Sequence, residues 1–404
     1  MASQPFNRDM FNDFDFEDPE FNERFYDVLD AFVGRCPVAH STTGDGYHVI
    51  NRYKDVKQAG QDWRTFSSAK GFQPNRDPQM PLLPPEECDP PYHNSWRNAL
   101  NPYFRPEAVA AFEGSLRDEA NHLIDQFIGR GECDFVPDFS SKLPGNAMFK
   151  NLLGLPPEDI PTLIKDMDAG FYGPLEERTP SLNRAFTYLG DYLARRRDEP
   201  PRGDVVDVIA AGVELDGAPC PWSDQVGIIT DLALGGIVTA TFVMSGGMFH
   251  LATHPDDRQA LVGDPALIPQ AAEEFVRYFP PVVALGRSVT RDVELGGYQF
   301  KTGDFVLLNY ASAARDPDAV NKPTELDIHR ERVPHSAFGV GVHRCIGAHL
   351  ARLELKVTFE EFLRRIPEFR LRPGSQPTFE TGILRSMKSL PLVFRSARKD
   401  GKQP

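Results

Sequence analysis

One cysteine stands among glycines in the stretch "FGVGVHRCIGAHLARLEL", residues 338–355. The glycines around it are Gly339, Gly341 and Gly347. Such spacings let the backbone approach a flat or bulky group closely, which a plain buried thiol does not need. Apolar residues recur at helical spacing after Cys345 and predict a helix over residues 347–365. Because the N-terminal end of a helix favours thiolate over thiol, Cys345 is a candidate anionic ligand or nucleophile.

Several roles are open to this cysteine. A lone cysteine is most often a small buried apolar side chain. His343 and His349 could join Cys345 in a zinc site, although structural zinc takes four ligands in paired clusters and no second pair is evident. His343 could instead activate the thiol as a nucleophile. The remaining role is axial ligation of haem iron by the thiolate, with glycines clearing space under a flat macrocycle.

The composition is that of an ordinary globular protein. The 404 residues are 41% hydrophobic and 25% charged, and their number fits one large domain or several. The net charge of −14 argues against a nucleic-acid partner. The polar, acidic N-terminus lacks the pattern of a secretory signal. The cysteines are widely spaced and form no CxxC pair, as in a reducing compartment, so we expect a cytoplasmic protein.

The uncharged segment Leu232–Phe249 reaches the length of a candidate membrane span. Glycines and hydroxyl side chains interrupt it, and Asp231 and His250 flank it. A helix buried on all sides in a large soluble protein fits this composition better. We therefore expect a long central helix over residues 223–254 and no membrane span.

The rest of the chain has mainly helical patterns with proline-rich punctuation. Further helices are expected over residues 107–129, 182–198 and 266–279. Shorter β-like runs occupy residues 47–53, 287–300, 304–311 and 389–394. No repeat, low-complexity tract or composition shift marks a linker. The sequence predicts a mainly α fold with smaller β-sheets (α+β) in a single large domain, residues 1–404.

A second constellation of charged residues lies upstream of the cysteine, in "EEFVRYF". Glu274 and Arg277 are three residues apart on one helix face, so they can pair and jointly hold a third group. Taken alone, such a pair is most simply a solvated surface pair. Its position before the cysteine segment favours a structural role.

These segments resemble the cytochrome P450 haem-thiolate monooxygenases. "FGVGVHRCIG" matches the family's FGxGxHxCxG haem-binding stretch, and "EFVR" matches its upstream ExxR pair. "LGLPPEDIP", "GGIVT" and "TGILRSMKSLPLVF" look closest to the bacterial camphor-hydroxylase branch. The resemblance covers nearly the whole chain. It implies the cytochrome P450 fold, haem b (iron protoporphyrin IX) as cofactor and O2 as co-substrate.

The resemblance also implies roles for individual residues. Cys345 is the implied axial ligand of the iron. Other motif positions at the haem are Phe338, Gly339 and Gly347. The implied structural triad is Glu274, Arg277 and Arg330. The implied partners of the haem propionates are His93, Arg97, Arg287 and His343. Arginine and histidine suit this task because buried carboxylates need charge-assisted donors.

By position in the family, the substrate pocket is expected to be lined by apolar residues. These are Phe72, Leu82, Leu83, Phe171, Ile237, Val282, Val283, Ile383 and Leu384. Shape and burial would then place the substrate, although each of these residues could equally be ordinary core. With the camphor-branch similarity, the expected substrate is a small to medium apolar molecule of terpenoid type.

Electrons are expected to come from a separate protein. The chain ends shortly after "LPLVF" without room for a flavin or iron–sulfur module. We therefore expect a ferredoxin and a ferredoxin reductase as partners. Arg344, Arg352 and Lys356 lie around the cysteine in an acidic chain and could guide an acidic donor. Scattered solvated charges are the alternative interpretation.

The segment "GGIVTAT" departs from the family pattern of two glycines, one residue, an acid and a threonine. Aligning the glycines on Gly235 and Gly236 puts Thr239 in the alcohol position and Val238 in the acid position. Proton delivery would then run through water or a substrate group, or be slow. We expect an O2-dependent oxidoreductase with sluggish or leaky dioxygen activation. The alternatives are a peroxide-driven haem enzyme and a haem protein that binds gaseous ligands without turnover.

Overall fold

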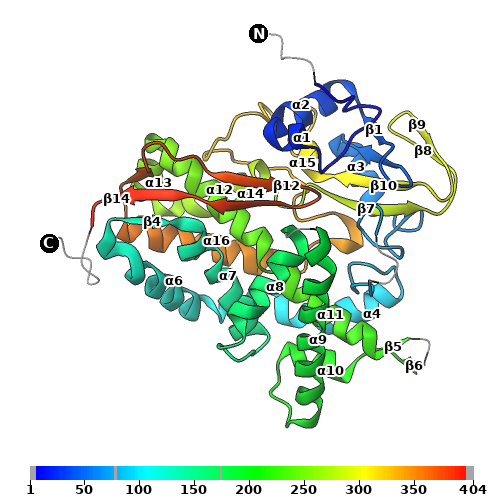
Figure 1. The fold of residues 1–404 in the computed structure, drawn as a ribbon, viewed down its shortest axis with the longest axis horizontal. Coiled ribbons are helices and arrows are strands. Elements are labelled where there is room, and N and C mark those ends of the chain that lie inside the picture. The colour runs from blue at the N-terminus through cyan, green and yellow to red at the C-terminus, as the bar shows by residue number, and fades with distance from the viewer. Residues whose placement is uncertain (1–5, 77–79, 173–174, 216, 397–404) are drawn as a thin grey trace. The chain divides into compact units, whose positions relative to one another are not determined.

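The computed structural model describes residues 6–76, 80–172, 175–215 and 217–396. They form two compact units (Figure 1), of which the first draws on Met1–Pro90, Glu273–Cys345 and Phe379–Ser386. The second draws on Pro91–Ala272, Ile346–Thr378 and Met387–Pro404. Helices dominate and the sheets are small, which confirms the expected fold class. A single domain over residues 1–404 stays a prediction.

The first unit is built on a five-stranded sheet. In spatial order its strands are β1 (Val38–Ser41), β2 (Tyr47–Ile50), β10 (Phe305–Asn309), β7 (Ala284–Val289) and β3 (Phe66–Ser67). β2 and β10 run parallel, and the other neighbours run antiparallel. Val306 of β10 stands opposite Arg287 of β7, and Ser67 of β3 stands opposite Ser288. The sheet therefore fixes the backbone on both sides of Arg287.

Short helices and a hairpin complete this unit. They are α1 (Pro19–Glu23), α2 (Phe25–Arg35), α3 (Tyr53–Gln61), α15 (Tyr310–Ala313), the 3-10 turn η6 (Gly341–His343), β8 (Val293–Leu295) and β9 (Tyr298–Phe300). The N-terminal segment, which reads as polar and acidic in sequence, contributes aromatic side chains to the core. The ring of Phe14 packs edge-on against Phe16, Phe21 and Phe32, and all four are buried.

Helices make up most of the second unit. They are α4 (Tyr92–Leu100), η1 (Asn101–Phe104), α5 (Pro106–Ala110), α6 (Glu113–Phe127), η2 (Ile128–Arg130), η3 (Val136–Ser140), α7 (Lys142–Asn146), η4 (Ala147–Leu152), α8 (Ile160–Tyr172), α9 (Leu175–Asp198), α10 (Val205–Ala211), α11 (Trp222–Gly235), α12 (Val238–Thr253), α13 (Pro255–Gly263), η5 (Pro265–Leu267) and α16 (Ala348–Arg365). Its strands are β4 (Glu132–Asp134), β5 (Glu214–Leu215), β6 (Ala218–Pro219), β11 (Phe369–Leu371) and β14 (Pro391–Phe394). Three elements contain residues of both units: α14 (Ile268–Tyr278), β12 (Thr378–Thr381) and β13 (Arg385–Ser389).

The expected central helix over residues 223–254 is in fact two helices. α11 ends at Gly235 and α12 begins at Val238, so the break falls on Gly236 and Ile237, at the end of the glycine pair, where helix propensity is low. A Cβ added to Gly236 would lie 2.2 Å from Cε of Met148, so a side chain at this position would require the flexible end of Met148 to move. The Thr239 hydroxyl donates to the Gly235 carbonyl at 2.9 Å across the break. The break therefore lies within the segment Gly235–Thr239 that is proposed for oxygen activation.

The stretch Trp222–Thr253 is, among the described residues, the one long and apolar enough to cross a membrane. Its most apolar window has a mean hydropathy of 1.8, and 67% of that window is buried in protein. Core helices of large globular proteins share this composition, and nearly all of α12 beyond Thr239 is buried. These observations agree with the expectation of an enclosed helix.

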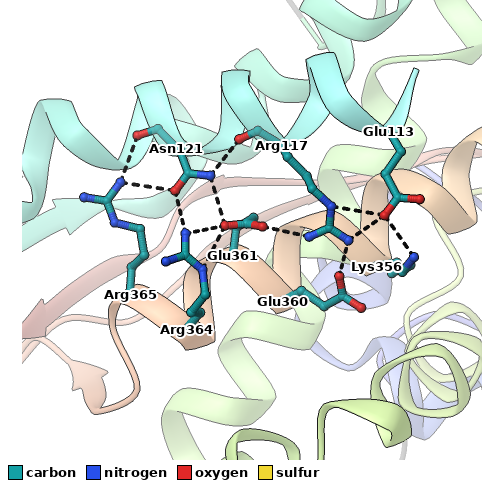
Figure 2. A network of polar contacts seen from close by, with 8 residues as sticks. All are labelled: Glu113, Arg117, Asn121, Lys356, Glu360, Glu361, Arg364 and Arg365. Atoms are coloured by element: carbon teal, nitrogen blue, oxygen red, sulfur yellow. Dashed lines mark hydrogen bonds and ion pairs between the residues drawn. The ribbon is translucent and has the colours of Figure 1, made fainter. Parts of the chain in front are cut away.

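A polar network joins α6 to α16 (Figure 2). Arg117 of α6 donates to Glu113 at 2.6 Å, to Glu361 at 2.7 Å, and also to Glu360. Lys356 of α16 donates to the same Glu113 at 3.1 Å. The network fixes the C-terminal half of the helix that follows Cys345. It also places an acidic partner beside Lys356, one of the cations expected to guide an electron donor.

Candidate functional site

Cys345 lies on a tight loop between η6 and the first turn of α16. Its backbone N–H donates to the Phe338 carbonyl at 2.8 Å, and the Gly339 N–H donates to the Ser336 carbonyl at 2.8 Å. The residue is solvent-exposed and its thiol is free of any disulfide. α16 begins three residues later at Ala348, with Gly347 as its N-cap. Cys345 thus stands directly before the N-terminal end of a helix in the chain.

The glycines before the cysteine are required by the loop itself. Gly339 and Gly341 have φ values of +68° and +72°, in the left-handed region that favours glycine. A Cβ on Gly341 would lie only 2.2 Å from the carbonyl oxygen of Gly60 in α3. The sequence pattern suggested glycines that make room for a ligand. The structure shows that two of them also shape the turn and admit the α3 backbone.

The zinc alternative finds no ligand set. Across the described part of the chain, no group of three or more histidine, cysteine, aspartate or glutamate side chains is arranged to hold a metal ion. Cys345 is therefore not the member of a multi-ligand zinc cluster among these residues. A single thiolate ligand is the arrangement that haem iron uses.

Two buried nitrogen donors of the predicted set lie in the same unit as Cys345. Arg287 of β7 is 2% exposed; one guanidinium nitrogen donates to the Gly286 carbonyl at 2.6 Å and another lies 4.0 Å from Glu86. His343 is 8% exposed, and its Nε2 lies 3.1 Å from the hydroxyl of Ser68. A buried guanidinium and a buried imidazole are suitable donors for carboxylates.

The other two predicted propionate partners lie on α4 in the second unit. His93 is buried, and Arg97 stands one helical turn further along the same face. The Tyr92 hydroxyl donates to Asp224 of α11 at 2.6 Å. This bond ties α4 to the helix that ends at Gly235. The pair is thus attached to the element that leads to Val238 and Thr239.

Glu274, Arg277 and Arg330 come together in a buried cluster. Arg277 donates to both carboxylate oxygens of Glu274, at 2.8 and 2.6 Å, and both residues are fully buried. Nε of Arg330 lies 3.1 Å from each oxygen of the same carboxylate. Arg277 also donates to the backbone carbonyls of Ala314 and Pro323 at 3.0 and 2.8 Å. The cluster crosslinks α14 to the long loop that leads to the cysteine segment.

Several expected pocket residues meet in the first unit. Val282 and Leu384 form an isolated antiparallel bridge, and the Val283 N–H donates to the Ile383 carbonyl at 2.8 Å. The Phe72 carbonyl accepts the Gly286 N–H at 2.8 Å, next to this bridge along β7. The structure therefore brings five of the nine residues to neighbouring backbone segments.

The remaining pocket residues are more scattered. Leu83 is 9% exposed and Leu82 is 38% exposed. Ile237 is buried at the start of α12 in the second unit. Phe171 lies in α8, and its side chain is outside the described residues.

The sequence did not predict two residues whose side chains make hydrogen bonds to segments of the site. Glu87 is 2% exposed and accepts the N–H groups of Phe72 and Leu83 at 3.0 and 2.9 Å, so it fixes that loop. Ser68 holds His343, as described above. Neither belongs to a recognisable motif, and Ser68 contacts His343 across 275 residues of sequence.

Comparison with known proteins identifies the family. The cytochrome P450 family model matches residues 266–391. A probable cytochrome P450 127A1 of Sinorhizobium fredii is 31% identical, covering 88% of this chain and 85% of the relative. The steroid C26-monooxygenase of Mycolicibacterium smegmatis is 31% identical, covering 87% and 88%. The crystal structure of CYP101J2 is 29% identical, covers 96% of this chain and all of that chain, and gives a TM-score of 0.83.

The chain belongs to the cytochrome P450 family, and it is a monooxygenase. It accordingly uses haem b with an axial cysteine thiolate, and O2. The chain's own residues fit a haem. The first unit contains the exposed thiol of Cys345, and it also contains the buried side chains of Arg287 and His343. When bound, the haem supplies the activation of O2.

Proposed function

We propose that Cys345 is the axial thiolate of a haem monooxygenase that inserts one oxygen atom from O2 into a small to medium apolar substrate of terpenoid type. The observation that carries the proposal is the exposed thiol on a glycine-shaped loop at the start of α16. His93, Arg97, Arg287 and His343 would hold the two propionates. The buried triad of Glu274, Arg277 and Arg330 would keep the preceding loop in place.

The substrate class is supported by the character of the expected pocket residues. Phe72, Val283 and Ile237 are buried and apolar, so placement would rest on shape and desolvation. Relatives named steroid C26-monooxygenases act on steroids, which are also apolar. A charged substrate would find no counter-charge among these side chains.

Electron delivery by a separate ferredoxin and ferredoxin reductase is the second part of the proposal. Arg344 directly precedes Cys345 in the sequence and Arg352 follows it on α16, and both would attract an acidic donor. Lys356 contributes less than its charge suggests, because Glu113 lies 3.1 Å away. None of the five cysteines, all of which lie in the described residues, forms a disulfide, which supports a cytoplasmic location.

Proton delivery would depend on few groups of the chain. Between Gly235 and Thr239, the Thr239 hydroxyl is the one side chain with an exchangeable proton. It donates to the Gly235 carbonyl at 2.9 Å and can rotate to an ordered water. Val238 offers no proton where relatives of this family have an acid. Protons would therefore reach the bound dioxygen through water or a substrate group, and turnover would be slow or would release peroxide without product.

A binding screen followed by turnover tests this function. Terpenoid, steroid, aromatic and fatty-acid compounds are titrated into the haem protein, and the Soret shift reports binding. Hits are then incubated with ferredoxin, its reductase and NAD(P)H, or with peroxide alone. Binding and ferredoxin-driven hydroxylation of terpenoids are expected. Tight binding of charged fatty acids only, or product with peroxide but never with ferredoxin, would contradict the proposal.

A further inference from the structure

A buried serine contacts the histidine two residues before the cysteine. Ser68 lies directly after β3 and is 1% exposed. Its hydroxyl oxygen is 3.1 Å from Nε2 of His343, across 275 residues of sequence. Both side chains belong to the first unit, as does Cys345. The contact is a long-range hydrogen bond in a place where water has little access.

The position of Ser68 is itself fixed by two neighbours. Asp89 accepts the Ser68 N–H at 3.0 Å with one carboxylate oxygen and the Ser67 hydroxyl with the other. Ser67 also pairs across the sheet with Ser288, the residue after Arg287. The backbone of Ser68 is therefore held by a carboxylate on one side and by β7 on the other.

We propose that Ser68 is a positioning residue for the haem site. Its hydroxyl donates to Nε2 of His343 and thereby holds the imidazole in one orientation with its proton on Nδ1. A neutral imidazole has one donor and one acceptor nitrogen, so occupying Nε2 as acceptor leaves Nδ1–H as the donor. This inference rests on the proposed function, in which His343 donates to a haem propionate.

The arrangement matters because the bond from imidazole to propionate is directional. A hydrogen bond to a charged carboxylate is among the stronger ones, but only when the donor is already aligned. Without Ser68, the ring can rotate or carry its proton on Nε2, and part of the alignment is lost. The expected loss is that of one ordinary hydrogen bond, roughly three- to tenfold in haem affinity.

The test measures haem loss from the holoprotein to an excess of apomyoglobin. Ser68→Ala is expected to accelerate haem loss about three- to tenfold. Ser312→Ala is the matched control, since its buried hydroxyl contacts the Leu29 carbonyl at 3.5 Å and not His343, and it should change the rate less than twofold. Ser68→Thr and Ser68→Val form an isosteric pair that differs by the hydroxyl alone. The Thr variant should lose haem more slowly than the Val variant.

A double-mutant cycle separates positioning from general loosening of the loop. In a His343→Ala background, Ser68→Ala should add nothing to the rate of haem loss, because the group it orients is gone. An equal acceleration with and without His343 would overturn the proposal, as would equal rates for the Thr and Val variants. Wild-type protein that takes up no haem would instead overturn the proposed function itself.

Discussion

Glu274→Gln tests how much the buried triad contributes to stability. The substitution keeps the shape of the side chain but removes the carboxylate that Arg277 and Arg330 share. Glu274 and Arg277 are both fully buried, and the carboxylate also accepts the Asp327 N–H at 3.1 Å. The variant would therefore leave a buried guanidinium without its counter-charge.

The expected cost follows from that geometry. Removing one partner of a buried ion pair costs about 3–5 kcal/mol, because the other charge stays desolvated. The contacts from Arg277 to backbone carbonyls persist in the variant and keep the loss from being larger. Against a total stability of about 5–15 kcal/mol, this is enough to lower the yield of folded protein severely.

Urea unfolding of the haem-loaded protein, followed by far-ultraviolet circular dichroism, gives the difference in free energy of unfolding. The matched control is Glu325→Gln, whose side chain pairs with Lys322 at 3.1 Å where both are exposed, and it should cost less than about 1 kcal/mol. Arg330→Gln should fall between them, at about 1.5–3 kcal/mol. A cost for Glu274→Gln no larger than that of the control would refute the reasoning.

The remaining predictions concern pH, protons and the electron donor. Burial raises the pKa of Glu354 from its ordinary value of 4.5 to about 8. Between these two pH values the carboxyl group stays protonated in the folded protein, whereas it is ionised in the unfolded protein. Wild-type stability should therefore fall between pH 4.5 and about 8 relative to Glu354→Gln; parallel pH profiles of unfolding free energy would exclude this. Val238→Asp should raise ferredoxin-driven product formation and Thr239→Ala should increase uncoupled peroxide release, unless native turnover already proves fast and tightly coupled. Arg352→Glu should raise the Michaelis constant for ferredoxin and added salt should slow reduction, whereas a salt-independent rate contradicts steering.

Local patterns predicted the helical framework well. Apolar spacing located the helix after Cys345, observed from Ala348 to Arg365. The same reasoning joined α11 and α12, because composition marks a buried helix but not a break within it. The break falls at Gly236 and Ile237, and no spacing of apolar residues marks it. The phenylalanines near the N-terminus were likewise hidden by the acidic residues between them.

The site was predictable where a motif carries it and not elsewhere. The cysteine segment and the Glu274–Arg277 pair were recognisable because their chemistry is encoded in short spacings. The pocket role of Leu82 was expected from position in the family alone and stays a prediction; the residue is 38% exposed. No motif in the sequence marks Ser68, since its contact with His343 is formed across 275 residues. Contacts of this kind follow from the fold and not from the local pattern.

The carbon monoxide spectrum of the reduced protein tests the central claim most directly. Wild-type protein should show the red-shifted carbonyl Soret band that a thiolate ligand produces. Cys345→Ala should lose this band, whereas Cys88→Ala, which removes another free cysteine, should keep it. A red-shifted band that persists in Cys345→Ala would contradict the assignment of Cys345 as the axial ligand.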